Sequence, residues 1–264
     1  MPDPVAVITG AARGIGEATA LRLAEDGWRL VLVDRAQDDP ALAYPLATDA
    51  ELRAVAERCG GDDRAVAVVA DVRDQAGLDG AVRTAVERYG GLDAALAVAG
   101  AICGGDTTWA TTDDAWSAMV GINLEGVWRL ARAAVPAMLE RPPPRQGRFV
   151  AVSSSGGTLG LPRLAAYTAA KHGVEGLVRS LAAELGDEGI TANVVAPGST
   201  ATVMLDASAA VYGLEDPVEF AAHHLQPRLI DRDEVAAVLH WLCGSDSSAI
   251  TGAVLAVDAG MTAG

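Results

Sequence analysis

The chain has 264 residues, half of them hydrophobic, and a formal net charge of -15 at pH 7. This acidity argues against nucleic acid or an anionic membrane as a binding partner. No leader and no apolar run of about 18 residues is apparent, so a cytoplasmic location is expected. The cysteines, Cys59, Cys103 and Cys243, are too scattered for a disulfide framework or a cysteine-based zinc site, so no metal is expected.

The first forty residues read as a strand, a turn, a helix and a second strand. Residues 5–8 form a continuous apolar run of the kind that is buried on both faces of a parallel sheet. A helical pattern follows over 18–24 and stops at Gly27, and the next apolar run, 29–33, ends at Asp34. This order predicts a βαβ unit with a glycine-rich first turn.

The alternation continues to the end of the chain. We predict further strands at 65–70, 93–99, 148–152, 191–195 and 254–257, and helices at 75–89, 165–185 and 232–243, with a long helix that ends near Leu139. Strands separated by helices imply crossover connections in a parallel sheet. The predicted fold class is therefore α/β, a single doubly wound domain over 1–264 with a parallel sheet of about seven strands flanked by helices.

Two segments do not fit this alternation. Residues 35–64 are longer than a crossover requires, and residues 199–227 mix small, apolar and aromatic residues between a strand and a helix. Long segments at such places are usually binding loops or lids rather than core. We therefore expect an insert at about 35–64 and a substrate lid at about 199–227.

The turn after the first strand, Thr9-Gly-Ala-Ala-Arg-Gly-Ile-Gly16, suits a dinucleotide. Glycine lets the backbone approach a pyrophosphate, whose charge is favoured at a helix N-terminus. Asp34, after the second strand, can accept hydrogen bonds from an adenosine ribose and repels a 2′-phosphate, which predicts NAD as the cofactor. Arg13 and Arg35 leave NADP open as an alternative, since a nearby arginine accommodates that phosphate.

The stretch Tyr167-Thr-Ala-Ala-Lys171 contains the only lysine of the chain. In a helix the two side chains share a face, one turn apart. An ammonium there favours tyrosinate, so we expect the pKa of Tyr167 to fall below its usual value of about 10 and the phenol to act as a general acid/base. A pair that merely shares an exposed face is the alternative, but the serines at 153–155, the glycine turn and Asp34 favour the catalytic interpretation.

Together with these residues, Asp71-Val72, Asn123, Ser154 and Asn193-Val-Val-Ala-Pro197-Gly198 resemble the pattern of the short-chain dehydrogenase/reductase family. The resemblance extends from the first strand to the last. It implies a Rossmann-type domain that binds NAD(P), often in a homotetramer. One departure is visible after the fourth strand, where the family's usual Asn-Asn-Ala-Gly is Ala97-Val-Ala-Gly100, which leaves open how that turn is held.

The resemblance also implies a role for each matched residue. Tyr167 would be the general acid/base, and Lys171 would lower its pKa and hold the nicotinamide ribose. Ser154 would bind the substrate oxygen, Asn123 would support a proton relay, and Thr202 would contact the nicotinamide amide. The cofactor-binding residues expected on this basis are Gly10, Arg13, Gly14, Ile15, Gly16, Asp34, Arg35, Asp71, Val72, Ala99, Gly100, Tyr167, Lys171, Pro197, Gly198, Thr200 and Thr202.

The insert, which includes Tyr44-Pro-Leu-Ala-Thr48, resembles the mycofactocin-associated, carveol-dehydrogenase-like branch of the family. In that branch the insert is thought to cover the dinucleotide, so that NAD stays bound and electrons pass to a separate redox carrier. An ordinary surface insertion is the alternative interpretation.

The predicted function is therefore an NAD-dependent oxidoreductase that interconverts a hydrophobic secondary or cyclic alcohol and its ketone by hydride transfer. A 3-ketoacyl-carrier reductase is an alternative that Asp34 and the negative charge disfavour. A non-catalytic NAD-binding sensor would not need Tyr167, Lys171 and Ser154 together. An apolar substrate is expected because the residues of the predicted pocket and lid are largely apolar: Leu159, Leu161, Met204, Leu205, Val211, Tyr212, Leu214 and Phe220.

Overall fold

A parallel sheet forms the centre of the computed structural model, which describes residues 3–263. Seven strands pair in the spatial order β3-β2-β1-β4-β5-β6-β7, and every neighbouring pair is parallel. The predicted α/β class and strand number are confirmed. The strands are β1 (Val5–Thr9), β2 (Arg29–Asp34), β3 (Ala65–Val69), β4 (Ala94–Ala97), β5 (Gly147–Val152), β6 (Ile190–Pro197) and β7 (Val254–Val257).

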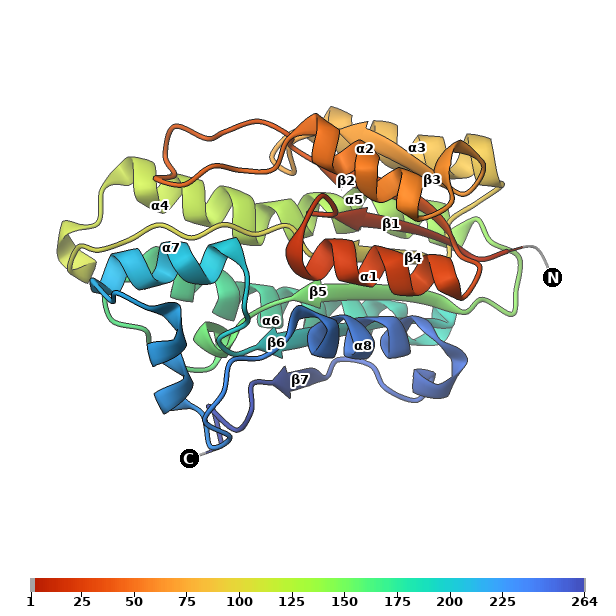
Figure 1. The fold of residues 1–264 in the computed structure, drawn as a ribbon. Coiled ribbons are helices and arrows are strands. Elements are labelled where there is room, and N and C mark those ends of the chain that lie inside the picture. Colours follow the sequence, from red (N-terminus) through yellow and green to blue (C-terminus); the bar gives the residue numbers. More distant parts are fainter. Residues whose placement is uncertain (1–2, 264) are drawn as a thin grey trace.

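Helices cover both faces of this sheet. On one face α1, α2 and α8 pack together, and Figure 1 shows α1 and α8 side by side in front of the strands. On the other face lie α3, α4, α5 and α6. The helices are α1 (Gly14–Glu25), α2 (Asp49–Arg58), α3 (Gln75–Tyr89), α4 (Asp113–Val120), α5 (Gly126–Leu139), α6 (Ala165–Leu185), α7 (Val203–Tyr212) and α8 (Arg232–Cys243).

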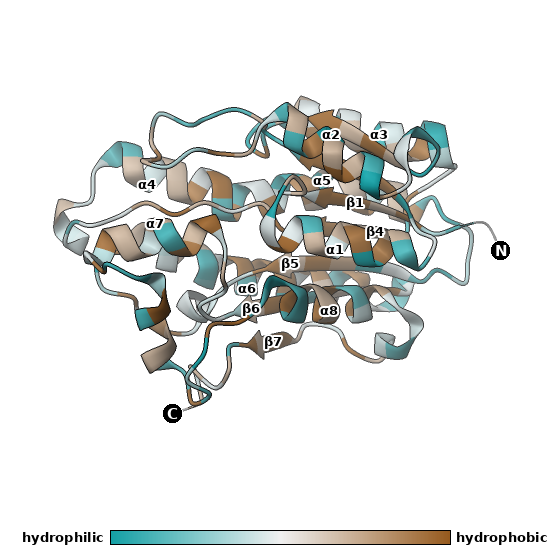
Figure 2. Ribbon diagram, viewed as in Figure 1, coloured by the Kyte–Doolittle hydropathy of each residue, from teal (hydrophilic) through white to brown (hydrophobic). Residues whose placement is uncertain are grey.

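The central strands are largely apolar because both of their faces are buried. In β1, Val5 and Val7 belong to the core under α3, α5 and α6, whereas Ala6 and Ile8 belong to the core under α1 and α8. Successive side chains of a strand point to opposite faces, so one run of apolar residues supplies two cores. Figure 2 shows the same pattern, with brown strands between helices of mixed polarity.

The order of the strands reverses between β1 and β4, which lie next to each other at the centre of the sheet. Ligands of such sheets bind beyond the carboxyl ends of the strands at this switch point. The residues after β2, together with α4 and α7, lie beyond that edge in Figure 1. The switch point and these segments therefore position the candidate site.

Two helical features differ from the sequence prediction. The helix α7 lies in segment 199–227, where a lid and no helix was expected, because its run of mostly apolar residues lacks the polar face that identifies a surface helix. The long helix expected to end near Leu139 consists of α4, a π-helical segment over Gly121–Glu125, and α5. Such a π-helical turn is rare and often marks a functional position.

Within residues 3–263, no helix combines the length and the apolar character needed to cross a bilayer. The same residues contain no group of three or more His, Cys, Asp or Glu side chains arranged to hold a metal ion.

Candidate active site

The turn between β1 and α1 brings bare backbone to the edge of the sheet. Gly10 and Gly14 have φ angles of 69° and 61°, a region that side chains other than glycine rarely adopt. A Cβ atom at Gly10 would lie 2.6 Å from the Cα of Ala99, and one at Gly16 would overlap the carbonyl oxygen of Gly10. Only glycine therefore permits this approach between the turns after β1 and β4.

The first turn of α1 is open to an anion. Arg13 stands at the N-cap, and its side chain makes no capping hydrogen bond. The N–H groups of the first turn of a helix have no partner inside that helix, and the helix dipole favours negative charge there. A glycine turn followed by an uncapped helix start fits the pyrophosphate of a dinucleotide.

A cavity of ≈ 470 Å³ lies against this turn and the ends of β1, β2, β3 and β4. It is lined by most of the residues that the sequence predicted for the cofactor: Gly10, Arg13, Gly14, Ile15, Gly16, Asp34, Arg35, Asp71, Val72, Ala99, Gly100 and Thr202. We name it the coenzyme cavity.

Five residues expected to bind the cofactor lie outside the lining of this cavity, and three of them, Pro197, Gly198 and Thr200, follow one another closely at the end of β6. Gly198 packs against the residue after β7, since a Cβ there would lie 2.9 Å from the Cα of Asp258. Thr200 donates a hydrogen bond to the carbonyl of Gly198 and pairs with Ile230 as an isolated β-bridge. Together with Pro197, which ends β6, Gly198 and Thr200 hold the end of that strand in place. The next residue along the chain that lines the coenzyme cavity is Ala201.

Backbone N–H groups hold the side chain of Asp34 in place at the carboxyl end of β2. Its carboxylate accepts hydrogen bonds from the N–H groups of Ala12 at 3.1 Å and Ala36 at 3.3 Å. The arginines that left NADP open are both engaged elsewhere. Arg35 forms ion pairs with Asp39 and Asp71, and Arg13 donates to the carbonyl of Pro45 at 2.7 Å.

The insert supplies one wall of the coenzyme cavity, through residues that the sequence analysis did not assign to the cofactor. Tyr44, Leu46, Ala47 and Glu51 line the cavity. The Tyr44 hydroxyl accepts a hydrogen bond from the N–H of Ile102 at 3.1 Å, which anchors the insert to the segment after β4. Hydrophobic periodicity identifies no such residue, because the insert has no regular structure from 35 to 48.

The predicted catalytic pair occupies α6. Tyr167 and Lys171 are 6% and 3% exposed, and the ammonium nitrogen of Lys171 lies 5.7 Å from the centre of the Tyr167 ring. This ammonium donates a hydrogen bond to the carbonyl of Val152, at the end of β5, at 2.9 Å. Neither side chain lines the coenzyme cavity. Lys171 lies beneath its wall, since a Cβ at Gly100 would be 3.5 Å from the Lys171 nitrogen, and Tyr167 lies beside Lys171.

Of the three consecutive serines, Ser154 is the one whose hydroxyl faces the tyrosine. A Cβ at Gly156 would lie 3.5 Å from the Ser154 Oγ and 3.4 Å from a ring carbon of Tyr167, so both groups border the same small space. Ser153 instead donates to the carbonyl of Lys171 at 3.1 Å and ties β5 to α6. Ser155 is buried. The structure thus places Ser154, rather than its neighbours, beside the phenol.

The ionisation of this pair differs from the expectation. Burial raises the pKa of the Tyr167 phenol above its usual value, although the Ser154 hydroxyl works in the opposite direction. Burial also lowers the pKa of Lys171 to about 8. The prediction of a lowered tyrosine pKa is therefore wrong for the chain by itself, because desolvation of the phenol outweighs the effect of its neighbours.

Asn123 lies in the π-helical turn and holds the turn after β4. Its amide nitrogen donates to the carbonyl oxygens of Ala101 and Met119, both at 3.0 Å, and its amide oxygen accepts from the N–H of Ala101 at 3.2 Å. The N–H of Ala99 also donates to the Thr9 hydroxyl at 3.3 Å. These contacts show how the turn is held without the family's two asparagines.

A second cavity, of ≈ 620 Å³, adjoins the first and shares Tyr44 and Val203 with it. We name it the substrate cavity. Of the apolar residues expected in the pocket and lid, Val211 lines this cavity and Met204 lines the coenzyme cavity, whereas the other six line neither. Its main walls are Ala41, Ala43, Pro45, Ile102, Cys103, Ala115, Ala166, Ala207, Ala210 and Val211, with Asp106, Thr111, Arg163 and Asp206 among the polar members.

Comparison with known proteins places this geometry in a family. A family model described as Enoyl-(Acyl carrier protein) reductase matches residues 10–262. The (-)-trans-carveol dehydrogenase of Rhodococcus erythropolis is 38% identical over 270 residues, which cover 98% of this chain and 97% of that protein. A Mycobacterium tuberculosis protein named as an uncharacterized NAD-dependent oxidoreductase is 37% identical over 263 residues, which cover 97% of this chain and 94% of the relative.

Among solved structures, the crystal structure of carveol dehydrogenase from Mycobacterium avium in complex with NAD has a TM-score of 0.94 and 35% sequence identity. The match covers 100% of this chain and 99% of that chain. Fold, length and sequence thus agree over the whole molecule. The chain belongs to the short-chain dehydrogenase/reductase family, as its motifs predicted.

Proposed function

We propose that the protein interconverts a hydrophobic secondary or cyclic alcohol and its ketone by hydride transfer. It is an NAD-dependent oxidoreductase, and the predictions of this enzyme class and of NAD as its cofactor are confirmed by the family and by its NAD-dependent relatives. The observation that supports the proposed reaction is the position of Lys171 and Asn123 directly beneath Gly100, in the wall of the coenzyme cavity, with Tyr167 beside Lys171 on α6.

Each of these side chains has a distinct task in the proposed reaction. The bound nicotinamide supplies the hydride chemistry. Ser154 holds the substrate oxygen, and Tyr167 takes the proton from the alcohol or returns it to the ketone oxygen. Lys171, mostly protonated at pH 7 because its pKa is about 8, provides the positive charge that stabilises tyrosinate during the transfer.

The chemistry of the substrate cavity supports an apolar, cyclic substrate. Alanine and branched residues form most of its wall. Carveol, the substrate in the name of one relative, is a cyclic alcohol of this kind. A 3-ketoacyl-carrier reductase is disfavoured, because Asp34 in the cavity wall would repel the 2′-phosphate of NADP and the chain has a net charge of -15. The non-catalytic sensor is disfavoured by the buried Tyr167 and Lys171 pair.

Exchange of Tyr167→Phe tests the proposed reaction. Removal of the hydroxyl should reduce turnover of a cyclic alcohol such as carveol by about 10²- to 10⁴-fold, the usual contribution of a general acid/base. NAD should still bind. Tyr89→Phe, at the end of α3 opposite the site, is the matched control and should keep full activity. Near-normal turnover by the Tyr167 variant would contradict the assignment.

The contacts of the insert support retention of the coenzyme. The insert is anchored by Tyr44 to Ile102 and by Pro45 to Arg13, and it forms a wall of the coenzyme cavity. NAD held behind this wall would have to be reoxidised in place by a separate redox carrier of the mycofactocin type. The homotetramer implied by the family belongs to this proposal, and the exposed Trp116 and Trp128 on α4 and α5 offer apolar surface for a partner subunit.

Retention of NAD is tested by the nucleotide content of the purified protein after long dialysis and denaturation. Near-stoichiometric NAD, with turnover that depends on an artificial electron acceptor, is the expected result. Nucleotide-free protein that reduces added NAD in solution would contradict retention and would leave the proposed reaction intact.

A further inference from the structure

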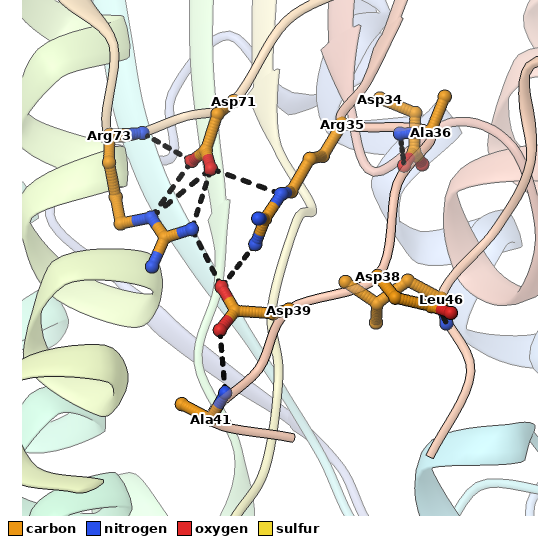
Figure 3. A network of polar contacts seen from close by, with 9 residues as sticks. All are labelled: Asp34, Arg35, Ala36, Asp38, Asp39, Ala41, Leu46, Asp71 and Arg73. Atoms are coloured by element: carbon orange, nitrogen blue, oxygen red, sulfur yellow. Dashed lines mark hydrogen bonds and ion pairs between the residues drawn. The ribbon is translucent and has the colours of Figure 1, made fainter. Parts of the chain in front are cut away.

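A group of charged side chains meets at the end of the coenzyme cavity that Asp34 marks. Arg35 follows β2, Asp39 lies in the insert, and Asp71 and Arg73 follow β3. Figure 3 shows the two arginines and the two aspartates Asp39 and Asp71 pointing toward one another. Asp34, Arg35, Asp71 and Arg73 line the cavity, whereas Asp39 lies behind the wall.

Asp39 is the buried member of this group. Its side chain is 3% exposed, and its carboxylate forms ion pairs with Arg35 and with Arg73, the latter at 2.7 Å. A third hydrogen bond comes from the N–H of Ala41 at 2.9 Å. Burial opposes ionisation of Asp39, but the hydrogen bonds from Ala41, Arg73 and Arg35 outweigh it and hold the pKa of this carboxyl below its usual value.

Asp71 completes the pairing of the two arginines. It accepts from Arg73 at 2.6 Å and lies 3.4 Å from Arg35. Two positive and two negative charges therefore cancel within the group. Asp34 remains as an additional carboxylate, and both of its oxygens face backbone N–H groups rather than an arginine.

This pairing bears on the choice between NAD and NADP. A 2′-phosphate next to the adenosine ribose needs a cation, and an arginine in the cavity wall normally supplies it. Arg35 has the right position in sequence, directly after Asp34, but the buried carboxylate of Asp39 engages its guanidinium. Because the Asp39 carboxylate is buried behind the cavity wall, water and salt screen its ion pair with Arg35 only weakly.

We propose that Asp39 is a specificity-determining residue that holds Arg35 away from the 2′-phosphate of NADP and so reinforces the preference for NAD. The proposal rests on the proposed binding of NAD in this cavity. A simpler role for Asp39 would be to attach the insert to the segment after β3 through Arg73. Loss of such an attachment would weaken the binding of NAD and of NADP equally, whereas loss of the proposed role would favour NADP.

The test compares three variants with the wild type. Asp39→Asn keeps the shape of the side chain and an acceptor for Ala41 but removes the charge. Asp38→Asn is the matched control on the same segment, because Asp38 accepts from the N–H of Leu46 and contacts neither arginine. The double variant Asp39→Asn with Arg35→Gln removes the arginine that the first change releases.

Thermal shifts and kcat/KM, each measured with added NADP and with added NAD, give the preference of each variant for NADP over NAD. Where nucleotide stays bound to the purified protein, the ratio of NADP to NAD released on denaturation gives the same preference. Asp39→Asn should move the ratio toward NADP by at least about tenfold, the scale of one hydrogen bond to a charged group. The control should keep the wild-type ratio, and Arg35→Gln in the double variant should abolish the gain.

An unchanged ratio in Asp39→Asn, or a gain that persists without Arg35, overturns the proposal and leaves NAD binding intact. Wild-type protein that binds neither coenzyme overturns the proposed function and this proposal together.

Discussion

The coenzyme cavity and the substrate cavity lie side by side, yet they are built in different ways. The first is formed largely by turns that directly follow strands, so the register of the sheet positions Gly10, Asp34, Asp71 and Gly100. The second is formed by the insert, the segment after β4, the loop before α6 and the helix α7, which no strand pairing holds. The framework of the sheet therefore positions the coenzyme cavity, whereas the attached segments shape the second cavity, which we propose for the substrate.

Gly16→Ala should produce the largest loss on the coenzyme side of this comparison. The added methyl group would overlap the carbonyl oxygen of Gly10, so the turn must shift. Overpacking of this kind costs about 1–3 kcal/mol, which corresponds to a loss of NAD affinity of about five- to 150-fold. Titration calorimetry or nucleotide content measures it.

Gly176→Ala is the control for that variant. A Cβ at this position in α6 meets no atom within 4 Å, so the change should leave NAD binding unchanged and slightly stabilise the helix. Equal losses in both variants would show that the turn does not depend on glycine.

Lys171→Met examines the buried pair beneath the coenzyme cavity through its pH dependence. The folded chain keeps the pKa of Lys171 at about 8, below the usual 10.5, because burial disfavours the charge. Between these values the unfolded chain binds more protons than the folded chain, so this group favours folding increasingly as the pH rises. The methionine variant has no titrating group at this position, so it lacks this increase in stability with pH.

From pH 7 to pH 10, the free energy of unfolding of Lys171→Met should therefore fall relative to wild type by about 2 kcal/mol. Urea denaturation at a series of pH values measures this difference. A difference independent of pH would show that the lysine keeps its ordinary pKa.

A pair of tyrosines gives the smallest effects: Tyr44 anchors the insert, which lines both cavities, and Tyr212 ends α7, which supplies much of the wall of the substrate cavity. Tyr44→Phe removes the acceptor for the N–H of Ile102, and Tyr212→Phe removes the donor to the carbonyl of Pro162 at 2.8 Å. Each bond contributes about 1 kcal/mol. The first change should speed NAD release by about fivefold and the second should raise the KM of the alcohol by a similar factor.

Stopped-flow release of NAD and steady-state kinetics measure these two quantities. If both variants altered both quantities, the two cavities would have to be regarded as one site.

Most of the fold was predictable because each central element has a strong local signal. The helices α3, α6 and α8 and the strand β7 have the predicted bounds, since amphipathic or continuous apolar runs end there at turn residues. The helix α7 was missed, because an apolar run without a polar face looks the same in a helix and in a lid. Its register depends on packing against residues distant in sequence.

The candidate site divides in the same way. Residues in strand-end turns, such as Asp34 and Gly100, follow from spacing, because a parallel sheet brings successive strand ends to one edge. Contacts between distant segments do not follow from spacing. The partners of Asp39, the anchor of Tyr44 and the hydrogen bonds of Asn123 appear only in three dimensions.

The amino-acid sequence was enough to predict the class of the sheet, the dinucleotide turn and the candidates for the catalytic group, because glycine, a lone lysine and strand-end carboxylates act through short-range geometry. The tertiary structure alone decided the charge state and the surroundings of those residues. Burial raises the pKa of Tyr167 and lowers that of Lys171, and ion pairs with Asp39 and Asp71 engage Arg35. Desolvation and pairing depend on every segment packed around a charge, and those segments come together only in the folded chain.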